Sequence, residues 1–497
     1  MPVSPPSSIE RPIVGIWQVG GCSEFHPGSL FLEDGKVYLK IFLITDHGLQ
    51  PGTPPEEQHP TLIALQQPKR PTVFGETRSA GRITLFNCAR LRGEALALTR
   101  LEITLMVSEV WAGDAFIDAA AGYKAISFSA AGLHGVLSPA RVDSKWLLRS
   151  RPKHKSDTHR LKTLTGADHA YLFYPGEEIA ADITCSGMPY KIIFATSISH
   201  SSSSTDGISI RTTDFVRIET PGAALSELMA VASSIEQFLS VLCIAPFQGQ
   251  DIQLQIGEMQ RAKLLWSLRR EAAPTDPKTL PHQILASIAR HPQIAISALT
   301  SWFAAPDTRQ LARWLIVDSL FDNTWSTANF LAAAQAWEIA GRDEDDGVDQ
   351  DKSKKKKYAD ACDSARVALE AHLDEETAKR LYLLLKSSNR KSFADFVKEV
   401  LKKIPAAAAQ ALCQDVDQFV TTVVNVRNVL THMEGKKNLS IQKASGLAVV
   451  LTYKLIVLFC IYDCVSLGLP LDNLDMMLAN NYAAIAAGRP LPPLQAG

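Results

Sequence analysis

Residues 419–432 read FVTTVVNVRNVLTH, a stretch with the spacing of an amphipathic helix. At about 100° per residue, Asn428 and His432 lie near one another on one face, and Arg427 lies between them and the opposite face. That opposite face is expected to pack against a helical core, because its apolar residues recur every three or four positions. These residues are Phe419, Val423, Val426, Leu430 and Met433.

The residues around this stretch, 358–490, are expected to form an α-helical bundle. Asp374, Asn389 and Ser440 precede helical patterns and are suitable N-caps. The predicted helices are Tyr358–Leu373, Glu375–Lys386, Ser392–Ile404, Ala406–Met433 and Ile441–Leu467.

The last of these helices approaches membrane-spanning length, but Lys454 and Asp463 interrupt its apolar run. A charge near the centre of a membrane span is costly. We therefore expect a helix of the bundle core and no association with a membrane.

The segment before the bundle is highly charged. Residues 342–357 read RDEDDGVDQDKSKKKK, with no apolar period, and are expected to be an exposed linker. Residues 223–341 are expected to be a helical middle region with a short strand at Ile252–Ile256. Its predicted helices are Ala223–Leu242, Gln260–Arg270, Pro281–His291, Ile294–Ala304, Arg309–Phe321 and Ala328–Ala340.

Residues 1–222 have the pattern of a β-rich domain. Asp34-Gly35 separates two strand-like runs, and this pair predicts a hairpin because both residues tolerate a positive φ. Short strand-like runs bounded by Pro, Gly and Ser clusters favour a sandwich or a barrel-like sheet. The chain as a whole is therefore expected to be an α+β multidomain protein.

Composition excludes several classes of protein. The 497 residues carry 51 Lys and Arg against 52 Asp and Glu, which argues against a globally basic nucleic-acid coat. A hydrophobic fraction of 46% rules out general disorder. The eight cysteines lie far apart without a CxxC, so we expect reduced, mostly buried thiols in a cytoplasmic protein. The first residues lack the pattern of a signal peptide.

Most enzyme signatures are absent from the sequence, including those of P-loop NTPases, Rossmann dehydrogenases, zincins and α/β-hydrolases. The remaining candidates for catalysis are Arg427, Asn428 and His432. An Arg followed by a His at this distance is a loose pattern, since Arg149–His154 and Arg366–His372 also match it. The alternative is a His that only stabilises the end of a helix.

Arg427-Asn428-Val-Leu-Thr-His432 resembles the RNxxxH motif of the HEPN superfamily, and the apolar helix after it also resembles that fold. The N-terminal part resembles the ApeA N-terminal domain. The blocks that carry this second resemblance are Gly15–Trp17, His26–Leu30, Gly35–Leu39, Thr72–Thr77 and Gly81–Cys88. Together they resemble ApeA-type HEPN anti-phage defence proteins.

This resemblance implies a metal-independent endoribonuclease that needs no cofactor. The ribose 2′-OH would attack the phosphodiester, His432 would transfer protons, and Arg427 would stabilise the phosphate charge. Asn428 would orient the His or the phosphate. HEPN nucleases typically pair two motifs in one composite site, so a homodimer or higher oligomer through the bundle is expected. The N-terminal domain would act as a sensor, with a phage-derived trigger, and RNA cleavage would halt the host.

Basic residues are weaker candidates for binding the RNA backbone. They are Lys436 and Lys437 after the motif, and Arg149, Arg151, Lys153 and Lys155 in the N-terminal part. For the N-terminal group, a solvated basic loop without a binding role is the alternative.

Two other functions stay open at this point. The main alternative is a HEPN module without catalysis that binds a nucleotide or a partner. The presence of Arg427, Asn428 and His432 together favours the enzyme. A third possibility is the partner protein of a nucleotide transferase, for which the sequence shows no second catalytic motif.

Overall fold

The structure is a computed structural model that divides into two compact units. The sheet unit comprises residues 1–236 and 247–278, and the helical unit comprises 237–246 and 279–497. The residues that the structure describes are 9, 11–44, 60–66, 71–97, 100–130, 132–137, 178–203, 207–268, 284–322, 326–346, 352–388, 392–434 and 439–491.

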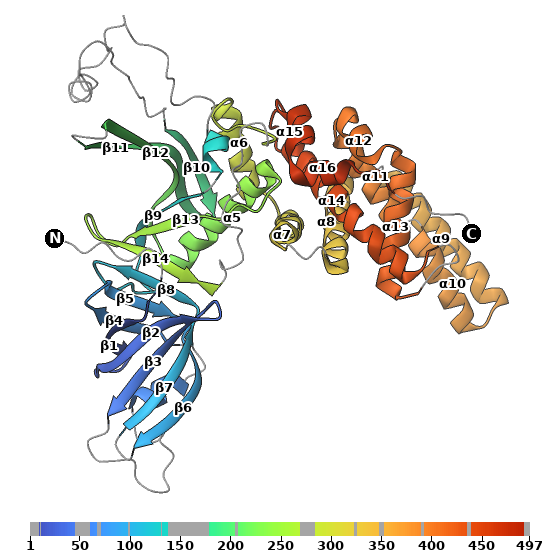
Figure 1. Ribbon diagram of the computed structural model, residues 1–497. Helices are drawn as coiled ribbons and strands as arrows, with labels where there is room; N and C mark the ends of the chain where they lie inside the picture. The colour runs from blue at the N-terminus through green and yellow to red at the C-terminus, as the bar shows by residue number, and fades with distance from the viewer. Residues whose placement is uncertain are drawn as a thin grey trace, which may run out of the picture. The chain divides into compact units, whose positions relative to one another are not determined.

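In the described part of the sheet unit, fourteen strands form one antiparallel sheet (Figure 1). They are β1 (Ile13–Val19), β2 (His26–Glu33), β3 (Lys36–Ile44), β4 (Val73–Thr77), β5 (Gly81–Phe86), β6 (Ala89–Ala97), β7 (Arg100–Val107), β8 (Glu109–Gly113), β9 (Tyr123–Ser129), β10 (Ile179–Cys185), β11 (Met188–Ser203), β12 (Gly207–Ala223), β13 (Gln250–Gln255) and β14 (Arg261–Ser267). Their order is β10-β11-β12-β9-β13-β14-β8-β5-β4-β1-β2-β3-β7-β6. Two short helices, α2 (Pro60–Gln66) and α3 (Leu133–Leu137), belong to the same unit.

The predicted hairpin at Asp34-Gly35 is confirmed. Glu33 pairs with Lys36 across the turn between β2 and β3. Asp34 and Gly35 have φ values of 49° and 71°, the left-handed conformation that a type I′ hairpin turn requires at both of its central residues. The turn therefore fixes the register of these strands as the local sequence predicts.

Trp17 organises the core of the first strands. Its side chain is fully buried on β1, between β2 and β4. A Cβ atom on Gly75 would lie 2.3 Å from the Trp17 ring, and one on Gly28 would lie 2.9 Å from it. Only glycine at these two positions leaves room for the indole, so three separate sequence blocks meet at one packing contact.

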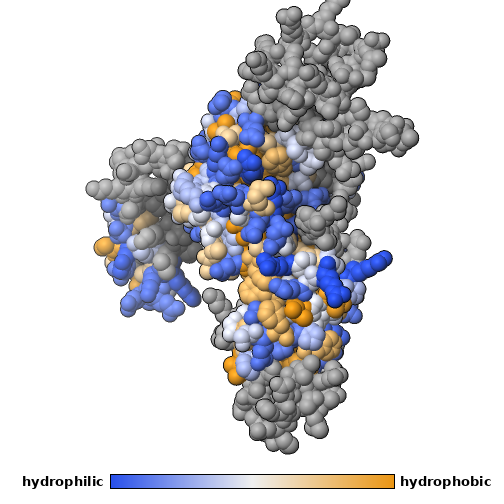
Figure 2. All heavy atoms as spheres, turned by 90° about the vertical axis from the view of Figure 1, so that its left-hand side faces the viewer, coloured by the Kyte–Doolittle hydropathy of each residue, from blue (hydrophilic) through white to orange (hydrophobic). Residues whose placement is uncertain are grey.

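Strand β1 alternates between buried and exposed side chains. Trp17 and Val19 are buried, whereas Val14 and Ile16 are 70% and 44% exposed. One face of the strand therefore packs against the core and the other faces solvent. In the lower part of Figure 2, where the first strands lie, hydrophobic residues gather on the surface.

The helical unit is built around one long helix. Helix α14 contacts α7, α8, α11, α12, α13 and α16. The helices are α6 (Pro292–Phe303), α7 (Asp307–Phe321), α8 (Thr327–Asp346), α9 (Lys352–His372), α10 (Glu375–Ser388), α11 (Phe393–Lys403), α12 (Ala406–Cys413), α13 (Val416–His432), α14 (Ile441–Ser466), α15 (Leu474–Asn480) and α16 (Tyr482–Gly488). A further helix, α5 (Leu225–Cys243), contributes residues to both units. The expected α+β class, with an N-terminal sheet and a C-terminal helical region, is confirmed.

Lys454 and Asp463, the charges that interrupt the apolar run of α14, are both buried. Lys454 is fully buried, and its ammonium donates hydrogen bonds to the backbone carbonyls of Leu412 and Ala487. Asp463 is also fully buried and pairs with two arginines. The expected burial of this helix within the bundle is thus confirmed. Among the described residues, α5 and α14 are long and apolar enough to span a membrane, and both are mostly buried.

Two predicted helices in the middle region were wrong. Residues 261–267 of the predicted helix Gln260–Arg270 form strand β14, which pairs with β8 and β13. The described residues of Pro281–His291, from 284 onward, are not helical. A short apolar run fits the period of a helix and that of a strand equally well. Strands far away in the sequence that can pair with it therefore decide which of the two forms.

The described parts of the charged segment 342–357, which are 342–346 and 352–357, are helical, although the sequence predicted an exposed linker there; 347–351 lie outside the described residues. Helix α8 continues through Asp346, and α9 begins at Lys352. Near the end of α8, Arg342 lies over the Phe396 ring of α11, and the Asp343 carboxylate accepts a hydrogen bond from the Thr308 hydroxyl of α7. These tertiary contacts support the charged end of the helix.

The predicted helix Ala406–Met433 is interrupted. Gln414 has a φ of 63°, which ends α12, and the Asp415 side chain caps α13 by accepting from the backbone N–H of Gln418 at 2.8 Å. An Asp within an apparent helix can instead start a new one.

Candidate functional site

Helix α13 carries the whole predicted motif and ends at its last residue, His432. Phe419, Val423, Val426 and Leu430 are buried, as expected of the core-facing side. Met433 was wrongly assigned to that side. Its φ is 52°, it follows the last helical residue, His432, and it is 69% exposed. The left-handed residue ends the helix and turns its own side chain away from the core.

Arg427 lies against two neighbouring helices. Its Nη2 atom is 2.6 Å from Oε2 of Glu338 on α8. The centre of its guanidinium lies 4.4 Å from the ring centroid of Phe393, the first residue of α11. The Arg427 side chain remains 31% exposed and that of Glu338 20% exposed. An ion pair and a cation–π contact therefore hold the guanidinium at the surface.

Glu338 is shared by two arginines. Its Oε1 atom accepts a hydrogen bond of 2.5 Å from Nη2 of Arg342, one helical turn later on α8. Arg342 in turn lies over the ring of Phe396. The cluster thus holds two positive charges and one negative charge, with a separate carboxylate oxygen for each arginine.

Asn428 and His432 lie on another side of α13. They are four residues apart and so share a face, whereas five residues rotate His432 about 140° from Arg427. Asn428 is half-buried and His432 is exposed in the last helical turn. Among the described residues, no hydrogen bond or ion pair joins His432 to Arg427. One chain therefore places the two side chains on the same helix end without bringing them together.

The other predicted site residues lie outside the described residues. This applies to Lys436, Lys437, Arg149, Arg151, Lys153 and Lys155. Their assignment to RNA binding stays a prediction.

Other reactive groups offer little to a site. In the described ranges, no group of three or more His, Cys, Asp or Glu side chains could hold a metal ion. The eight cysteines are free thiols, and six of them are buried. Burial raises the pKa of Cys243 to about 12 and that of Cys413 to about 12, so these thiols are poor nucleophiles.

Sequence reasoning missed Glu338 and Phe393. The predicted helix ended at Ala340, and Arg342 was assigned to the linker, so the pair was split between two elements. Glu338 and Arg342 are four residues apart with the acidic residue first, which is the favourable order on a helix. This spacing could have indicated that the helix continues past Ala340. Nothing local links Glu338 to a residue 89 positions later.

Two family models match the chain. ApeA N-terminal domain 1 matches residues 12–302, which is more than half of the chain. Apea-like HEPN matches residues 331–473, a span that includes Glu338, Phe393 and Arg427. Neither span ends at residue 222, where the sequence predicted the end of the N-terminal domain. No curated protein matches the chain. No solved structure matches it.

Proposed function

Because the chain belongs to the ApeA family and carries an Apea-like HEPN domain, we propose that it is an endoribonuclease of anti-phage defence. HEPN domains are typically ribonucleases. One observation carries the proposal furthest: α13 presents a partly exposed guanidinium and an exposed imidazole within its last two turns. Arg427, Asn428 and His432 are the proposed active-site residues.

The proposed reaction is an internal transesterification that uses no metal. The ribose 2′-oxygen attacks the neighbouring phosphorus, and the bond from phosphorus to the 5′-oxygen breaks. The products are a 2′,3′-cyclic phosphate and a 5′-OH. His432 suits the proton transfers, since imidazole titrates near neutral pH. Arg427 suits the phosphate, because its planar fork can donate two hydrogen bonds to the developing charge.

A second copy of the chain would complete this site. Arg427 and His432 point about 140° apart on one helix, and one imidazole cannot serve as both base and acid at once. We propose a homodimer or a higher oligomer in which two α13 ends face each other. Purified protein that stays monomeric at micromolar concentration, before and after activation, would contradict this part of the proposal.

The sheet unit would restrain the nuclease until it meets a phage-derived trigger. A cavity of about 770 Å³ in this unit supports that role. Neither Arg78 nor Arg261 has a side-chain partner among the described residues. Substituting both with Ala should abolish protection but leave RNA cleavage by the overproduced protein. Charged residues lining the cavity are Glu76, Arg78, Arg82, Asp114, Arg261 and Lys263.

The alternative function is a HEPN module that binds a nucleotide or a partner without catalysis. The ion pair between Arg427 and Glu338 is the observation that favours it, since this arginine already has a partner. Under either function we propose that the protein acts in the cytoplasm, without a membrane.

Variants in phage-challenged cells test the proposal. Arg427→Ala and His432→Ala should each abolish protection and cleavage of cellular RNA, with melting temperatures like that of the wild type. Cleavage by the purified, activated protein should persist in EDTA. A His432→Ala variant that still cleaves RNA would overturn the enzymatic function.

The chain provides matched controls for both variants. Arg366 also pairs with a carboxylate, that of Glu370, and lies over an aromatic ring, that of Tyr382. His372 is likewise an exposed histidine in the last turn of a helix. Arg366→Ala and His372→Ala should keep full protection, because neither belongs to the motif.

A further inference from the structure

We infer that Glu338 is a positioning residue: together with Phe393 it holds the Arg427 guanidinium so that the remaining donors face the RNA phosphate. This inference rests on the proposed ribonuclease function. It extends the proposed site from the motif on α13 to a second helix, α8.

The contact leaves most of the arginine's donors available. Glu338 accepts a hydrogen bond from Nη2 only. Among the described residues, Nε and Nη1 of Arg427 have no partner, and the side chain is 31% exposed. A guanidinium has five N–H donors in a rigid fork, so one edge can bind a phosphate while Nη2 stays bonded to Glu338.

Arg342 keeps the site positive. A lone Glu338 would neutralise Arg427 and weaken its attraction for a phosphate. Arg342 bonds to the second carboxylate oxygen of Glu338 at 2.5 Å, so the three side chains sum to one positive charge. The carboxylate can thus hold the arginine without cancelling the charge that the reaction uses.

Phe393 fixes the plane of the guanidinium. It begins α11 directly after the N-cap Ser392, whose hydroxyl accepts from the backbone N–H of Asp395. The Asp395 carboxylate accepts in turn from the backbone N–H of Ser392 at 2.8 Å. This capping box defines where α11 starts and hence where the ring lies. An ion pair sets one edge of the guanidinium and the ring sets its plane.

A series of Glu338 variants in the full chain tests the inference. Glu338→Ala should lower RNA cleavage and phage protection about 10- to 100-fold, because misplacing a catalytic group by about 1 Å costs up to 10²-fold. Glu338→Gln keeps an acceptor for Nη2 and should recover most of the lost activity. Recovery by this conservative variant, at an unchanged melting temperature, separates positioning from a general role in folding.

Glu370→Ala is the matched control. Glu370 also bonds an arginine one turn away on the same helix, Arg366 at 2.7 Å, but it does not touch Arg427. This variant should cleave RNA like the wild type. Equal losses in Glu338→Ala and Glu370→Ala would overturn the inference.

The opposite result has a distinct meaning. If Glu338→Ala or Glu338→Gln cleaves RNA faster than the wild type, Glu338 is an inhibitory latch, and the inference is wrong. Wild-type activity in Glu338→Ala also overturns it, provided that Arg427→Ala is inactive. If Arg427→Ala itself remains active, the proposed function fails instead, and Glu338 loses its proposed role with it.

Discussion

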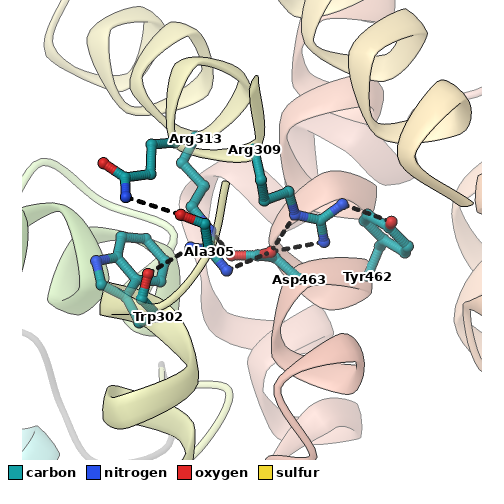
Figure 3. A network of polar contacts seen from close by, with 7 residues as sticks. Trp302, Ala305, Arg309, Arg313, Tyr462 and Asp463 are labelled. Atoms are coloured by element: carbon teal, nitrogen blue, oxygen red, sulfur yellow. Dashed lines mark hydrogen bonds and ion pairs between the residues drawn. The ribbon is translucent and has the colours of Figure 1, made fainter. Parts of the chain in front are cut away.

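Two clusters in the helical unit share one composition, a carboxylate between two arginines, yet differ in what surrounds them. In the first, Asp463 on α14 is fully buried and pairs with Arg309 and Arg313 of α7 (Figure 3). In the second, Glu338 is 20% exposed and pairs with Arg342 and Arg427. Both clusters also place their arginines over aromatic rings.

In the buried cluster, all the nitrogens of both arginine head groups have partners. Arg309 bonds Asp463 through Nε and Nη2, and its Nη1 donates to the Tyr462 hydroxyl at 2.5 Å. Arg313 bonds Asp463 through Nε and Nη2, and its Nη1 donates to the carbonyl of Trp302 at 3.1 Å. Because every nitrogen is engaged and Arg309, Arg313 and Asp463 are all buried, the cluster has no donor that a ligand could reach.

The surface cluster differs in how many of its arginine nitrogens have partners and in how far it is exposed to solvent. Among the described residues, Arg427 bonds another side chain through Nη2 only, and its side chain is 31% exposed. The same residue types therefore form both a sealed cluster and a partly exposed one, and residue type alone does not distinguish them. The number of unused donors and their access to solvent do.

The largest expected difference is in stability. Asp463→Asn leaves two buried arginines without a counter-charge, so the free energy of unfolding should fall by about 3–5 kcal/mol. Glu338→Gln should change it by less than about 1 kcal/mol, because the pair is partly solvated. Urea denaturation of the full-length variants measures both values. Similar losses in the two variants would remove the distinction between the clusters.

Arginine-to-lysine substitutions should lower RNA cleavage in the surface cluster and stability in the buried cluster. Arg427→Lys keeps the charge but not the fork, so RNA cleavage should fall about 10- to 100-fold with little change in melting temperature. Arg313→Lys loses hydrogen bonds in the core and should cost about 1–3 kcal/mol of stability. RNA decay in infected cells and thermal unfolding provide the two readouts. Full activity in Arg427→Lys would mean that a point charge suffices at this position.

Salt should weaken only the surface cluster. A double-mutant cycle between Glu338 and Arg427 should give a coupling of about 0.5–1 kcal/mol at low salt, falling towards zero near 1 M NaCl. The same cycle between Asp463 and Arg313 should keep its coupling, since mobile ions do not reach a buried pair. Equal salt dependence in both cycles would contradict the burial of Asp463.

The smallest expected effect is on the pH dependence of stability, from Lys454, a buried charge with no carboxylate partner among the described residues. Burial lowers the pKa of Lys454 below its usual 10.5. Between the two values the unfolded chain binds more protons, so this residue should make stability rise with increasing pH. The slope should be smaller in Lys454→Met, measured by urea denaturation at several alkaline pH values. An equal slope in both proteins would show that Lys454 does not titrate in this range.

The local sequence was sufficient for features that depend on near neighbours. The Asp34-Gly35 hairpin, the caps at Asp374 and Ser440, and the burial of α14 followed from turn chemistry, capping and hydrophobicity. The motif on α13 was also visible, because its residues lie within six positions. Helix breaks at single residues, such as Gln414, were not visible, since one left-handed residue leaves little trace in composition.

By itself, the sequence determined the α+β class, the sheet-then-helix order and the residues of the RNxxxH motif. These features rest on side-chain periods of 2 residues in strands and 3.6 residues in helices, and on side-chain chemistry. All of these are local properties. The tertiary structure alone decided that β14 is a strand, that Trp17 packs between two glycines, and that Arg427 has Glu338 and Phe393 as neighbours. Each of these joins residues distant along the chain, and only packing determines which of many compatible partners are brought together.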